Sequence, residues 1–448
     1  MMNLAHTVYG DEFRGTANTL PGSHAPWVRA LRADAMEIFL DKGFPDMRME
    51  EWKYTDIRTL TRHHFTPSPG SADIHESSLK TRLLNNEPAH RLVFVDGHFA
   101  PELCPFNTLL TGVTITSLAY ALDNRPEELE AWLGHNADLY KPGFNALNTA
   151  FMSDGAYINL APDVVLEQPI HLLFIATGRP DTVTTLRNII VAGARSKARI
   201  LESYIALNDA AYLTNTVTEI NTGDSADIEH YKLEQESESA YHMAGIYVKQ
   251  DRDSRYTSHN IALGGWLVRN DLHVALNDSG ADCTLNGLYI TRGRQHVDNH
   301  TWIDHNKPRT TSNQWYKGVL DGRSRAVFNG RVVVHKDAQK TTAQQSNHNL
   351  LLSGNAEVDA KPQLEIYADD VKCAHGCTVG QLDAEALFYL RSRAVDAATA
   401  RSILVYAFAA DVLERIQLRP VRQLLEQELA VRLMDTETLR LHQELVVH

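Results

Sequence analysis

The short run Cys373–Cys377 brings two thiols and one imidazole, that of His375, close together in the sequence. If this run is a β-strand, Cys373, His375 and Cys377 point to one face, because side chains alternate along a strand. Thiolate and imidazole are ligands for zinc, copper(I) and iron–sulfur species. The spacing does not match that of closed structural zinc sites, and no fourth ligand is nearby. We expect a site that another chain completes, or a transient site. Two buried cysteines beside a hydrogen-bonded histidine are the alternative.

A second group of metal-binding residue types lies in the segment Gln295–His300, followed by Asp304 and His305. Alternate residues of this segment would also share a strand face, and mixtures of His and Asp bind metals. Polar side chains are common on solvated strand faces, however, and no fixed ligand motif such as H-E-x-x-H is present. We interpret this segment as strand faces and turns.

Several catalytic motifs are absent from the sequence. It contains no G-x-x-x-x-G-K-[ST], so we do not expect the chain to hydrolyse nucleotide through a P-loop of its own. It also has no G-x-S-x-G elbow and no C-x-x-C redox pair. The adjacent acids Asp369 and Asp370 would point to opposite faces of a strand, so they cannot act as two facing carboxylates.

The composition is that of a globular protein with a substantial core. The 448 residues are 43% hydrophobic and 22% charged, and 43 Lys and Arg against 56 Asp and Glu give a net charge of −13. This charge argues against a broad nucleic-acid-binding surface. The N-terminus has no signal-peptide pattern, and the longest apolar run, Ile403–Ala410, is far shorter than the roughly 20 residues of a membrane span. Four cysteines are too few for a disulfide framework, so we expect a cytoplasmic protein with reduced thiols.

The hydrophobic period divides the chain into four parts. The pattern is helical from about 24 to 65, with Pro26 in the first turn and Gly43 able to close the helix. A Pro/Ser/Gly stretch, Thr66–Ser71, is typical of a linker. We expect an N-terminal helical region with its linker (1–70), a mixed connecting region (71–165), a β unit (166–382) and a C-terminal helical domain (383–448).

The β unit consists of many short strands separated by turns, with no amphipathic helix of ordinary length. Four similar turns precede strands, and their alanines stand at 226, 281, 326 and 356, with gaps of 55, 45 and 30 between them. Such uneven spacing favours a β-solenoid with coils of unequal length over a propeller with fixed blades. A β-sandwich is the alternative. The expected strands include His171–Ala176, Ala198–Ser203, Met243–Val248, Leu272–Leu276, Arg331–His335 and Leu364–Tyr367.

After residue 383 the helical period returns. Asp383 is a suitable N-cap, with Glu385 in the first turn. A second helix, from about 396 to 417, is apolar on nearly all sides, and Pro420 opens a third. These helices are expected either to pack on the β unit or to form a partner interface.

Six runs of this sequence resemble the SufB/SufD family of iron–sulfur cluster assembly proteins. The resemblance extends from about residue 50 to 415. A Cys-x-His-Gly followed by Thr-Val-Gly-Gln-Leu-Asp is more similar to SufD than to SufB. The runs are Glu51–Asp56, Phe144–Asn148, Ser312–Gly318, Gln345–Ser353, Lys361–Asp383 and Glu385–Arg391.

The resemblance implies a right-handed parallel β-helix core flanked by N-terminal and C-terminal helical domains. It also implies a non-enzymatic scaffold subunit that pairs with a SufB-like paralogue through the β-helix, or with a second copy of itself. The C-terminal helices would bind SufC, an ABC-type ATPase that supplies the missing P-loop. Movement driven by ATP would then pass through these helices to the paired interface.

The resemblance further implies that Cys373 and His375 lie at the SufB–SufD interface, where a nascent cluster is built, as transient metal ligands completed by the partner chain. No cofactor is expected on this chain alone. The family often has a small residue such as alanine at the position of Cys377, so we expect a spare buried thiol there. A purely structural scaffold that supplies no ligand is the alternative. A carbohydrate-cleaving solenoid is not favoured, because the chain shows no groove of spaced acids.

Overall fold

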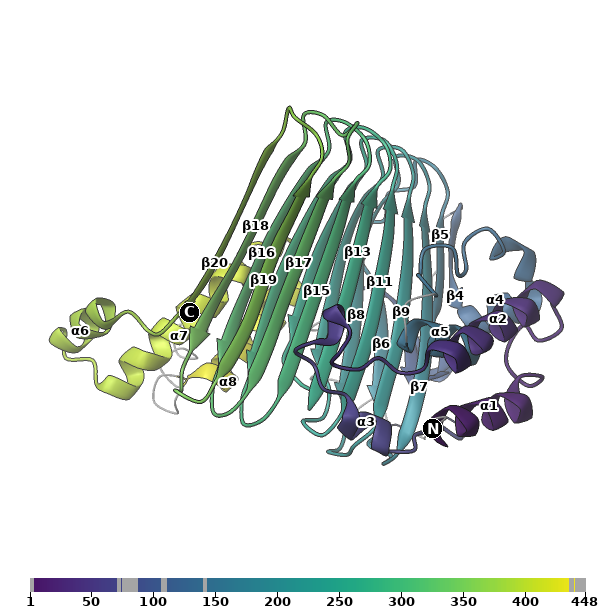
Figure 1. Cartoon of the computed structure of the whole chain (residues 1–448), viewed down its shortest axis with the longest axis horizontal. Helices are drawn as coiled ribbons and strands as arrows, with labels where there is room; N and C mark the ends of the chain where they lie inside the picture. The colour runs from purple at the N-terminus through teal and green to yellow at the C-terminus, as the bar shows by residue number, and fades with distance from the viewer. Residues whose placement is uncertain are drawn as a thin grey trace.

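The computed structural model describes residues 4–70, 74, 88–105, 111–139, 143–434 and 439. The protein is mainly β: a parallel β-solenoid with helices at its N-terminal and C-terminal ends, as the sequence predicts (Figure 1). No helix among these residues is long and apolar enough to cross a membrane. Ser71 of the expected linker and the C-terminal segments 435–438 and 440–448 lie outside the described residues.

The solenoid consists of two sheets, which we call sheet A and sheet B. From residue 156 on, each coil contributes one strand to each sheet, so strands two apart in sequence pair in parallel. At the N-terminal end, His90–Val95 pairs with His98–Phe99 and Val113–Ser117 with Ala156–Leu160 in antiparallel fashion. Sheet A contains β1 (Thr66–Pro67), β4 (Val113–Ser117), β5 (Ala156–Leu160), β7 (Thr182–Ala192), β9 (Leu213–Thr222), β11 (Tyr241–Gln250), β13 (Leu267–Leu276), β15 (His296–His305), β17 (Arg325–Val334) and β19 (Glu357–Ile366). Sheet B contains β2 (His90–Val95), β3 (His98–Phe99), β6 (Ile170–Ala176), β8 (Lys197–Ala206), β10 (Asp227–Gln235), β12 (Arg255–Ala262), β14 (Asp282–Thr291), β16 (Thr311–Leu320), β18 (Thr342–Leu351) and β20 (Lys372–Gly380).

The coils are more even in length than the spacing of the four alanines predicts. Tyr241 pairs with Leu213 on one side and Leu267 on the other, so one coil covers 213–240 and the next covers 241–266. Arg325 pairs with Glu357, so the coil at the C-terminal end of sheet A covers 325–356 and is only slightly longer. The gap of 55 covers two coils of sheet B, and that of 45 passes from one sheet to the other. The prediction of a solenoid is therefore confirmed, but the prediction of coils of unequal length is wrong. The uneven spacing of the four alanines arises because they do not occupy equivalent positions in successive coils.

A repeated left-handed turn joins sheet A to sheet B in successive coils. Arg195, Ser225 and Asp253 have φ angles of 59°, 59° and 53°. Each donates its backbone N–H to a carbonyl of the next coil, at 2.8, 2.8 and 3.0 Å. The turns therefore stack on one another and satisfy backbone groups that the strands leave free.

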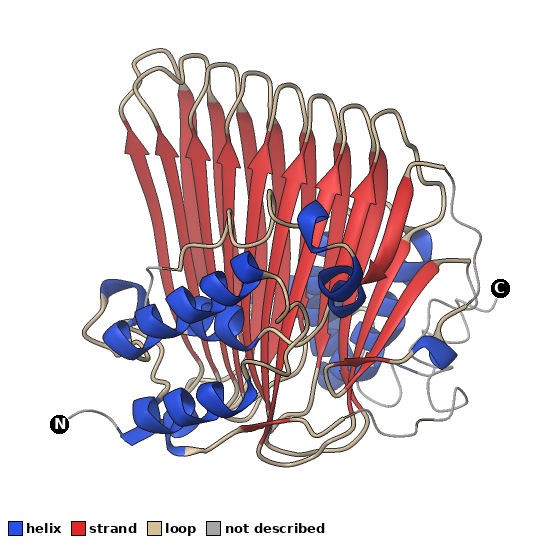
Figure 2. Cartoon of the chain, turned by 90° about the vertical axis from the view of Figure 1, so that its right-hand side faces the viewer, coloured by secondary structure: helices blue, strands red, loops and turns tan. Residues whose placement is uncertain are grey.

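The N-terminal helices and the segment that follows them cover the outer face of sheet A (Figure 2). Helix α2 (Pro26–Lys42) is closed by Gly43, whose φ is 68°, as predicted. The helical pattern expected up to residue 65 does not hold beyond it, because only Glu50–Trp52 and Arg58–Arg62 are helical there. Residues 44–57 then cross the sheet, where Trp52 and Ile57 pack against its strands, and Thr66 of the expected linker pairs with Thr182 of β7. The helical elements of this part are α1 (Leu4–Thr16), α2 (Pro26–Lys42), η1 (Glu50–Trp52), α3 (Arg58–Arg62), η3 (Pro101–Leu103), α4 (Leu118–Asn124), η4 (Pro126–Glu128) and α5 (Phe144–Phe151).

The C-terminal part forms three helices: α6 (Ala384–Ser392), α7 (Ala397–Leu413) and α8 (Arg419–Leu433). The side chain of Asp383 caps α6 by accepting the N–H of Glu385, as predicted. Helices α7 and α8 pack on the outer face of sheet B through a continuous apolar cluster. Helix α6 has no buried residue and projects away from the strands (Figure 1).

Candidate functional site

Strand β20, the last strand of sheet B, carries the cysteine and histidine row. It pairs with β18 on one side, and no described strand pairs with its other edge. In this pairing Cys373 lies beside Ala343, His375 beside Gln345 and Cys377 beside Asn347. These three residues of β18 are buried inside the solenoid. The Cys373, His375 and Cys377 side chains therefore share the inner face of β20, as alternation along a strand predicts.

No further described coil covers this inner face, so the three side chains differ in exposure. Cys373 is half-buried and packs against the edge of the main core. His375 and Cys377 are exposed, and Cys377 Sγ lies 3.7 Å from Asn347 Oδ1. The expectation of a buried thiol at Cys377 is wrong, because β20 is an edge strand at an open end of the solenoid.

Burial raises the pKa of the Cys373 thiol above its usual value, although a backbone hydrogen bond from Ala343 opposes this. Burial also raises the pKa of the Cys377 thiol. Both thiols are therefore protonated at neutral pH in the separate chain. A metal ion that binds either sulfur must displace the thiol proton.

Within the described residues, no three His, Cys, Asp or Glu side chains are grouped so that they could hold a metal ion. Cys373 and His375 are thus at most part of a ligand set. The remaining ligands of a four-coordinate site would have to come from a bound molecule or another chain.

An apolar surface lies beside the Cys373, His375 and Cys377 side chains at this end of the solenoid. Strand β19 is the edge strand of sheet A, and no described strand pairs with its outer side. Its inward-facing Val358 and Leu364 are half-buried and pack on the core. Val379 of β20, on the same face as His375, is exposed. The uncovered end therefore combines two strand edges without a described neighbour, aliphatic side chains, and the thiol and imidazole groups of β20.

The segment from His296 to His305 forms the whole of β15, which agrees with its interpretation as a strand face. Its acidic side chains are engaged within the protein. Asp298 lies 2.7 Å from Arg269 Nη1 and 3.0 Å from His300 Nε2. Asp304 lies 2.7 Å from His273 Nε2. His305 points inward and contacts two hydroxyl groups.

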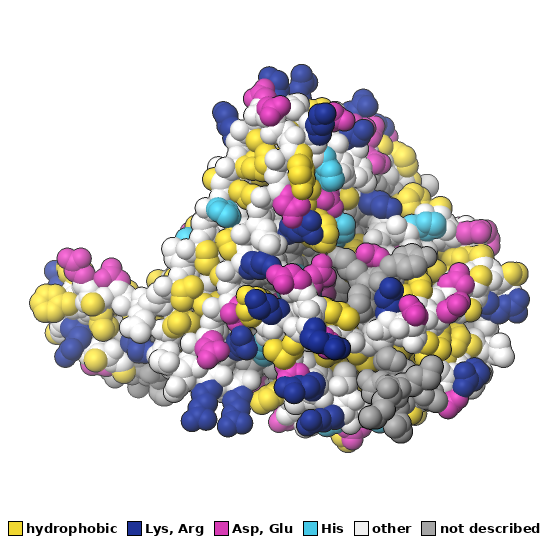
Figure 3. Space-filling model, viewed as in Figure 1, with side chains coloured by type: hydrophobic (Ala, Val, Ile, Leu, Met, Phe, Trp, Pro, Cys, Tyr) yellow, Lys and Arg dark blue, Asp and Glu magenta, His cyan; other side chains and the backbone are white. Residues whose placement is uncertain are grey.

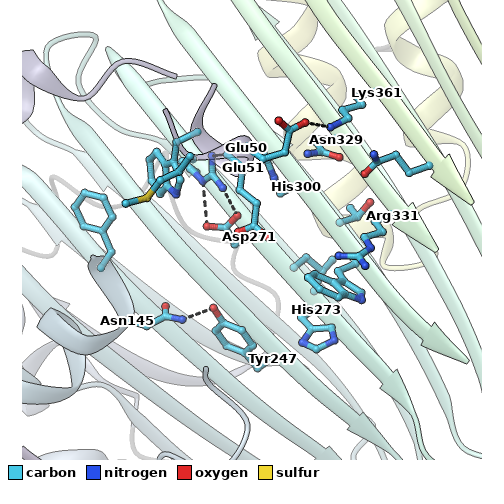
Figure 4. A pocket seen from close by; sticks show the side chains of 18 of the residues that line it. Glu50, Glu51, Asn145, Tyr247, Asp271, His273, His300, Asn329, Arg331 and Lys361 are labelled. Carbon is cyan, nitrogen blue, oxygen red and sulfur yellow. Dashed lines mark hydrogen bonds and ion pairs between the residues drawn. The ribbon is translucent and has the colours of Figure 1, made fainter. Parts of the chain in front are cut away.

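A cleft of about 630 Å³ crosses the outer face of sheet A from β11 to β19 (Figure 4). One row of register partners lines its floor, and the segment around η1 forms one wall. Ion pairs within the cleft join Arg331 to Glu365 and Lys361 to Glu50. Figure 3 shows acidic and basic side chains close together near the middle of this face. The row is Tyr247, His273, Trp302, Arg331 and Gln363.

The linear order of the residues does not indicate this cleft. The members of its lining row are far apart in the sequence, one from each coil, and only the coil register brings them together. Three basic side chains line the cleft, those of Arg269, Arg331 and Lys361, and each forms an ion pair with a carboxylate of the protein. None of these three is therefore left unpaired to bind an anionic ligand.

Comparison with known proteins matches nearly the whole chain to two family models. Residues 3–172 match the SufBD protein N-terminal region. Residues 174–408 match the model described as "SUF system FeS cluster assembly, SufBD core domain".

Named relatives cover similar lengths. An iron–sulfur cluster assembly SufBD family protein of Synechocystis is 34% identical over 405 residues, which cover 88% of this chain and 89% of the relative. The iron–sulfur cluster assembly protein SufD of Escherichia coli is 32% identical over 391 residues, covering 87% and 89%. SufD of Bacillus subtilis is 24% identical over 411 residues, covering 89% and 92%.

Proposed function

Because this chain belongs to the SufBD family of iron–sulfur cluster assembly proteins, we propose that it is a SufD-like scaffold subunit of a SUF-type complex. In this proposal a SufB-like paralogue covers the open end of the solenoid, and a nascent cluster is built there as cargo. The observation that supports it is the position of Cys373 and His375 on the inner face of an edge strand.

The open end suits a protein partner. Unpaired strand edges are templates for pairing with another chain, and folded proteins normally cover or blunt them. Among the described strands, β19 and β20 are the last of the two sheets, and aliphatic side chains lie between them. A partner that continues the two sheets would satisfy the edges, bury the aliphatic surface and place its own ligands opposite Cys373 and His375. A second copy of this chain is the alternative occupant.

The second proposed partner is a SufC-like ABC ATPase bound at the C-terminal helices. This chain has no P-loop motif, so nucleotide hydrolysis is assigned to that partner and the subunit itself is non-enzymatic. Phe388 and Tyr389 of α6 are 73% and 60% exposed, and hydrophobic side chains gather on this projecting part (Figure 3). Exposed aromatic side chains of this kind are typical of protein interfaces.

The two proposed interfaces are directly linked by the chain. Only residues 381–383 separate β20 from α6, and α7 and α8 are anchored on sheet B. A displacement of α6 by the ATPase would therefore act on the strand that carries Cys373 and His375. In this proposal, nucleotide-driven movement opens or reshapes the paired end so that iron and sulfide can enter. Assembly takes place in the cytoplasm.

Anaerobic co-expression with SufB-like and SufC-like partners tests this function. The bound iron and acid-labile sulfide of the purified complex are compared between wild type and His375→Ala. We expect an intact variant complex that has lost both. His24→Ala, an exposed histidine of the N-terminal region, is the matched control and should keep both. Wild-type iron and sulfide in an intact His375→Ala complex would contradict the ligand role.

A purely structural scaffold is the second candidate. It is favoured by the packing of Cys373 against the core and by the lack of a three-ligand group in the described part of the chain. Such a scaffold would position the ATPase and the paralogue without supplying a ligand. It predicts that Cys373→Ala and His375→Ala leave the iron and sulfide content unchanged, while disruption of α6 lowers it.

A further inference from the structure

Cys377 is the third member of the inner-face row on β20 and is exposed. Residues two apart on a strand are separated by about 6.6 Å at the backbone, so the backbone of His375 lies midway between those of Cys373 and Cys377. Cys373 and Cys377 are twice as far apart, or about 13 Å, which prevents a disulfide between them. The same separation makes it difficult for both sulfurs to bind one ion. The row therefore offers two overlapping ligand pairs that share His375.

A buried amide without a partner lies directly beneath this row. Gln345 is only 2% exposed, and neither its Oε1 nor its Nε2 atom has a hydrogen-bond partner. Its backbone is the register partner of His375. A Cβ atom at Gly330 would collide with Gln345 Nε2, so the amide reaches across the interior to β17 at a position that only glycine leaves open.

An amide buried without hydrogen bonds costs free energy unless a ligand, water or neighbouring side chain satisfies it. The nearest uncovered surface is the inner face of the last described coil. There Pro362 is the register partner of Gly330, and His375 is the register partner of Gln345. Proline contributes no N–H donor. The imidazole of His375 can donate or accept, and it makes no hydrogen bond to any described residue of the chain. Gln345 and His375 are therefore complementary groups on neighbouring strands.

We propose that Cys377 and His375 bind a thiophilic divalent cation of the Fe²⁺ type, with Gln345 as the positioning residue that holds the imidazole. This inference rests on the proposed function, since it assigns a second pair of iron-binding residues, Cys377 with His375, to the same open end of the solenoid. One ring nitrogen of His375 binds the ion, and the other donates its N–H to Gln345 Oε1. The thiol proton of Cys377 passes to solvent when the sulfur binds, and water or a partner chain fills the remaining positions. No electron transfer is involved.

Co²⁺ is the probe for this pair, because thiolate-bound Co²⁺ has a strong near-ultraviolet charge-transfer band. The reduced full-length chain is titrated anaerobically with Co²⁺, and Fe²⁺ then competes for the site. We expect the band in wild type and its loss in Cys377→Ser and in His375→Ala. Cys104→Ser, a half-buried cysteine of the N-terminal region, is the matched control and should keep the band. If Cys377→Ser retains the wild-type band and affinity, the proposal is wrong.

Alkylation gives a second readout that does not depend on the spectrum. N-ethylmaleimide should modify the exposed Cys377 in the free chain, and mass spectrometry of its peptide measures the extent. Saturating Co²⁺ should protect Cys377 at least tenfold, and His375→Ala should abolish the protection. Equal modification of Cys377 with and without Co²⁺ would overturn the assignment.

The role of Gln345 needs a readout that a structural role would not change. Gln345→Leu should weaken Co²⁺ binding by roughly tenfold to a hundredfold, the range found when outer partners of ligating histidines are removed. Gln345→Glu keeps an acceptor for the imidazole N–H and should restore most of the affinity. If Leu and Glu variants bind Co²⁺ as wild type does, Gln345 does not position His375.

These outcomes separate the inference from the proposed function. If His375→Ala removes cluster from the co-expressed complex while Cys377→Ser leaves Co²⁺ binding intact, only the inference fails. If Co²⁺ binds at Cys377 and His375 but the His375→Ala complex assembles cluster normally, the cation site stands and the ligand role in assembly fails.

Discussion

Arg187 and Glu219 form an ion pair that is completely shielded from solvent, with Arg187 Nη2 2.5 Å from Glu219 Oε1. The pair joins neighbouring strands β7 and β9 and extends into the N-terminal region. Glu219 accepts the backbone N–H groups of Gly134 and Asn136, and Arg187 donates to Asn148 Oδ1 of α5. One buried pair therefore attaches the N-terminal region to the solenoid.

Breaking this pair should strongly destabilise the protein. Glu219→Gln leaves the Arg187 guanidinium buried beside a neutral amide, and uncompensated buried charges of this kind cost about 3–5 kcal/mol. Urea unfolding measures the loss. Asp163→Asn breaks an exposed pair with Arg195 and should leave the unfolding midpoint in place. Equal midpoints for wild type and Glu219→Gln would contradict the structural role of the pair.

Acid should destabilise the fold through His305. Desolvation lowers the pKa of this buried imidazole to about 4, and it contacts Thr310 Oγ1 and Ser312 Oγ at 2.8 and 2.9 Å. In the unfolded chain the imidazole takes up a proton below about pH 6.5, while the folded chain stays neutral until about pH 4. Stability contributed by neutral His305 is therefore present above pH 6.5 and is lost as the pH falls toward 4.

Between pH 7 and pH 5 this residue should account for a loss of about 2 kcal/mol in the free energy of unfolding. Urea titrations at both pH values measure it. His305→Asn keeps a polar side chain without a titrating proton, so the difference between the two pH values should shrink by about that amount. An unchanged difference would mean that other groups cause the acid sensitivity.

Helix α6 should affect partner binding without affecting stability. The double variant Phe388→Ala and Tyr389→Ala removes two exposed rings, so the thermal midpoint should stay the same while binding of the SufC-like ATPase weakens by at least tenfold. Isothermal titration calorimetry measures the affinity. Val165→Ala, at an exposed residue near the N-terminal end of the solenoid, is the control and should bind normally. Normal binding by the double variant would place the ATPase interface elsewhere.

A charge on the uncovered end should prevent pairing. Val379 is half-exposed on the inner face of β20, so Val379→Lys leaves the separate chain folded but buries an unpaired ammonium when a partner docks. Size-exclusion chromatography with light scattering should show loss of the heterocomplex or homodimer. Val165→Lys, an exposed position near the N-terminal end of the solenoid, should assemble as wild type. A Val379→Lys chain that still pairs would show that the partner docks elsewhere.

The shared face of Cys373 and His375 could be predicted from the sequence, because it depends only on alternation along one strand. The exposure of Cys377 could not, because it depends on the lack of a described strand beyond β20. The four alanines correctly indicate a solenoid, but their uneven spacing does not reflect coils of unequal length. The first two directly precede strands of sheet B, while Ala326 lies in β17 and Ala356 directly precedes β19, both strands of sheet A.

The segment after Gly43 shows a different limit. Its apolar residues resemble the continuation of a helix, yet Trp52 and Ile57 join one apolar cluster with Leu213 of β9, far along the sequence. Local periodicity cannot distinguish an amphipathic helix from an irregular segment whose side chains are buried by such distant strands. The lining of the cleft on sheet A depends on coil register in the same way.

Each coil of the solenoid gains its stability from the coils on either side, and β20 has a described neighbour on one side only. The cost of local opening must therefore fall toward this end, so β20 amides should exchange with deuterium faster than those of β14, which is paired on both edges. The row of Cys373, His375 and Cys377 thus lies on the strand that the separate chain holds least firmly. A partner that covers it would supply the order that the last coil lacks, so assembly of the complex and completion of the site would be a single cooperative event.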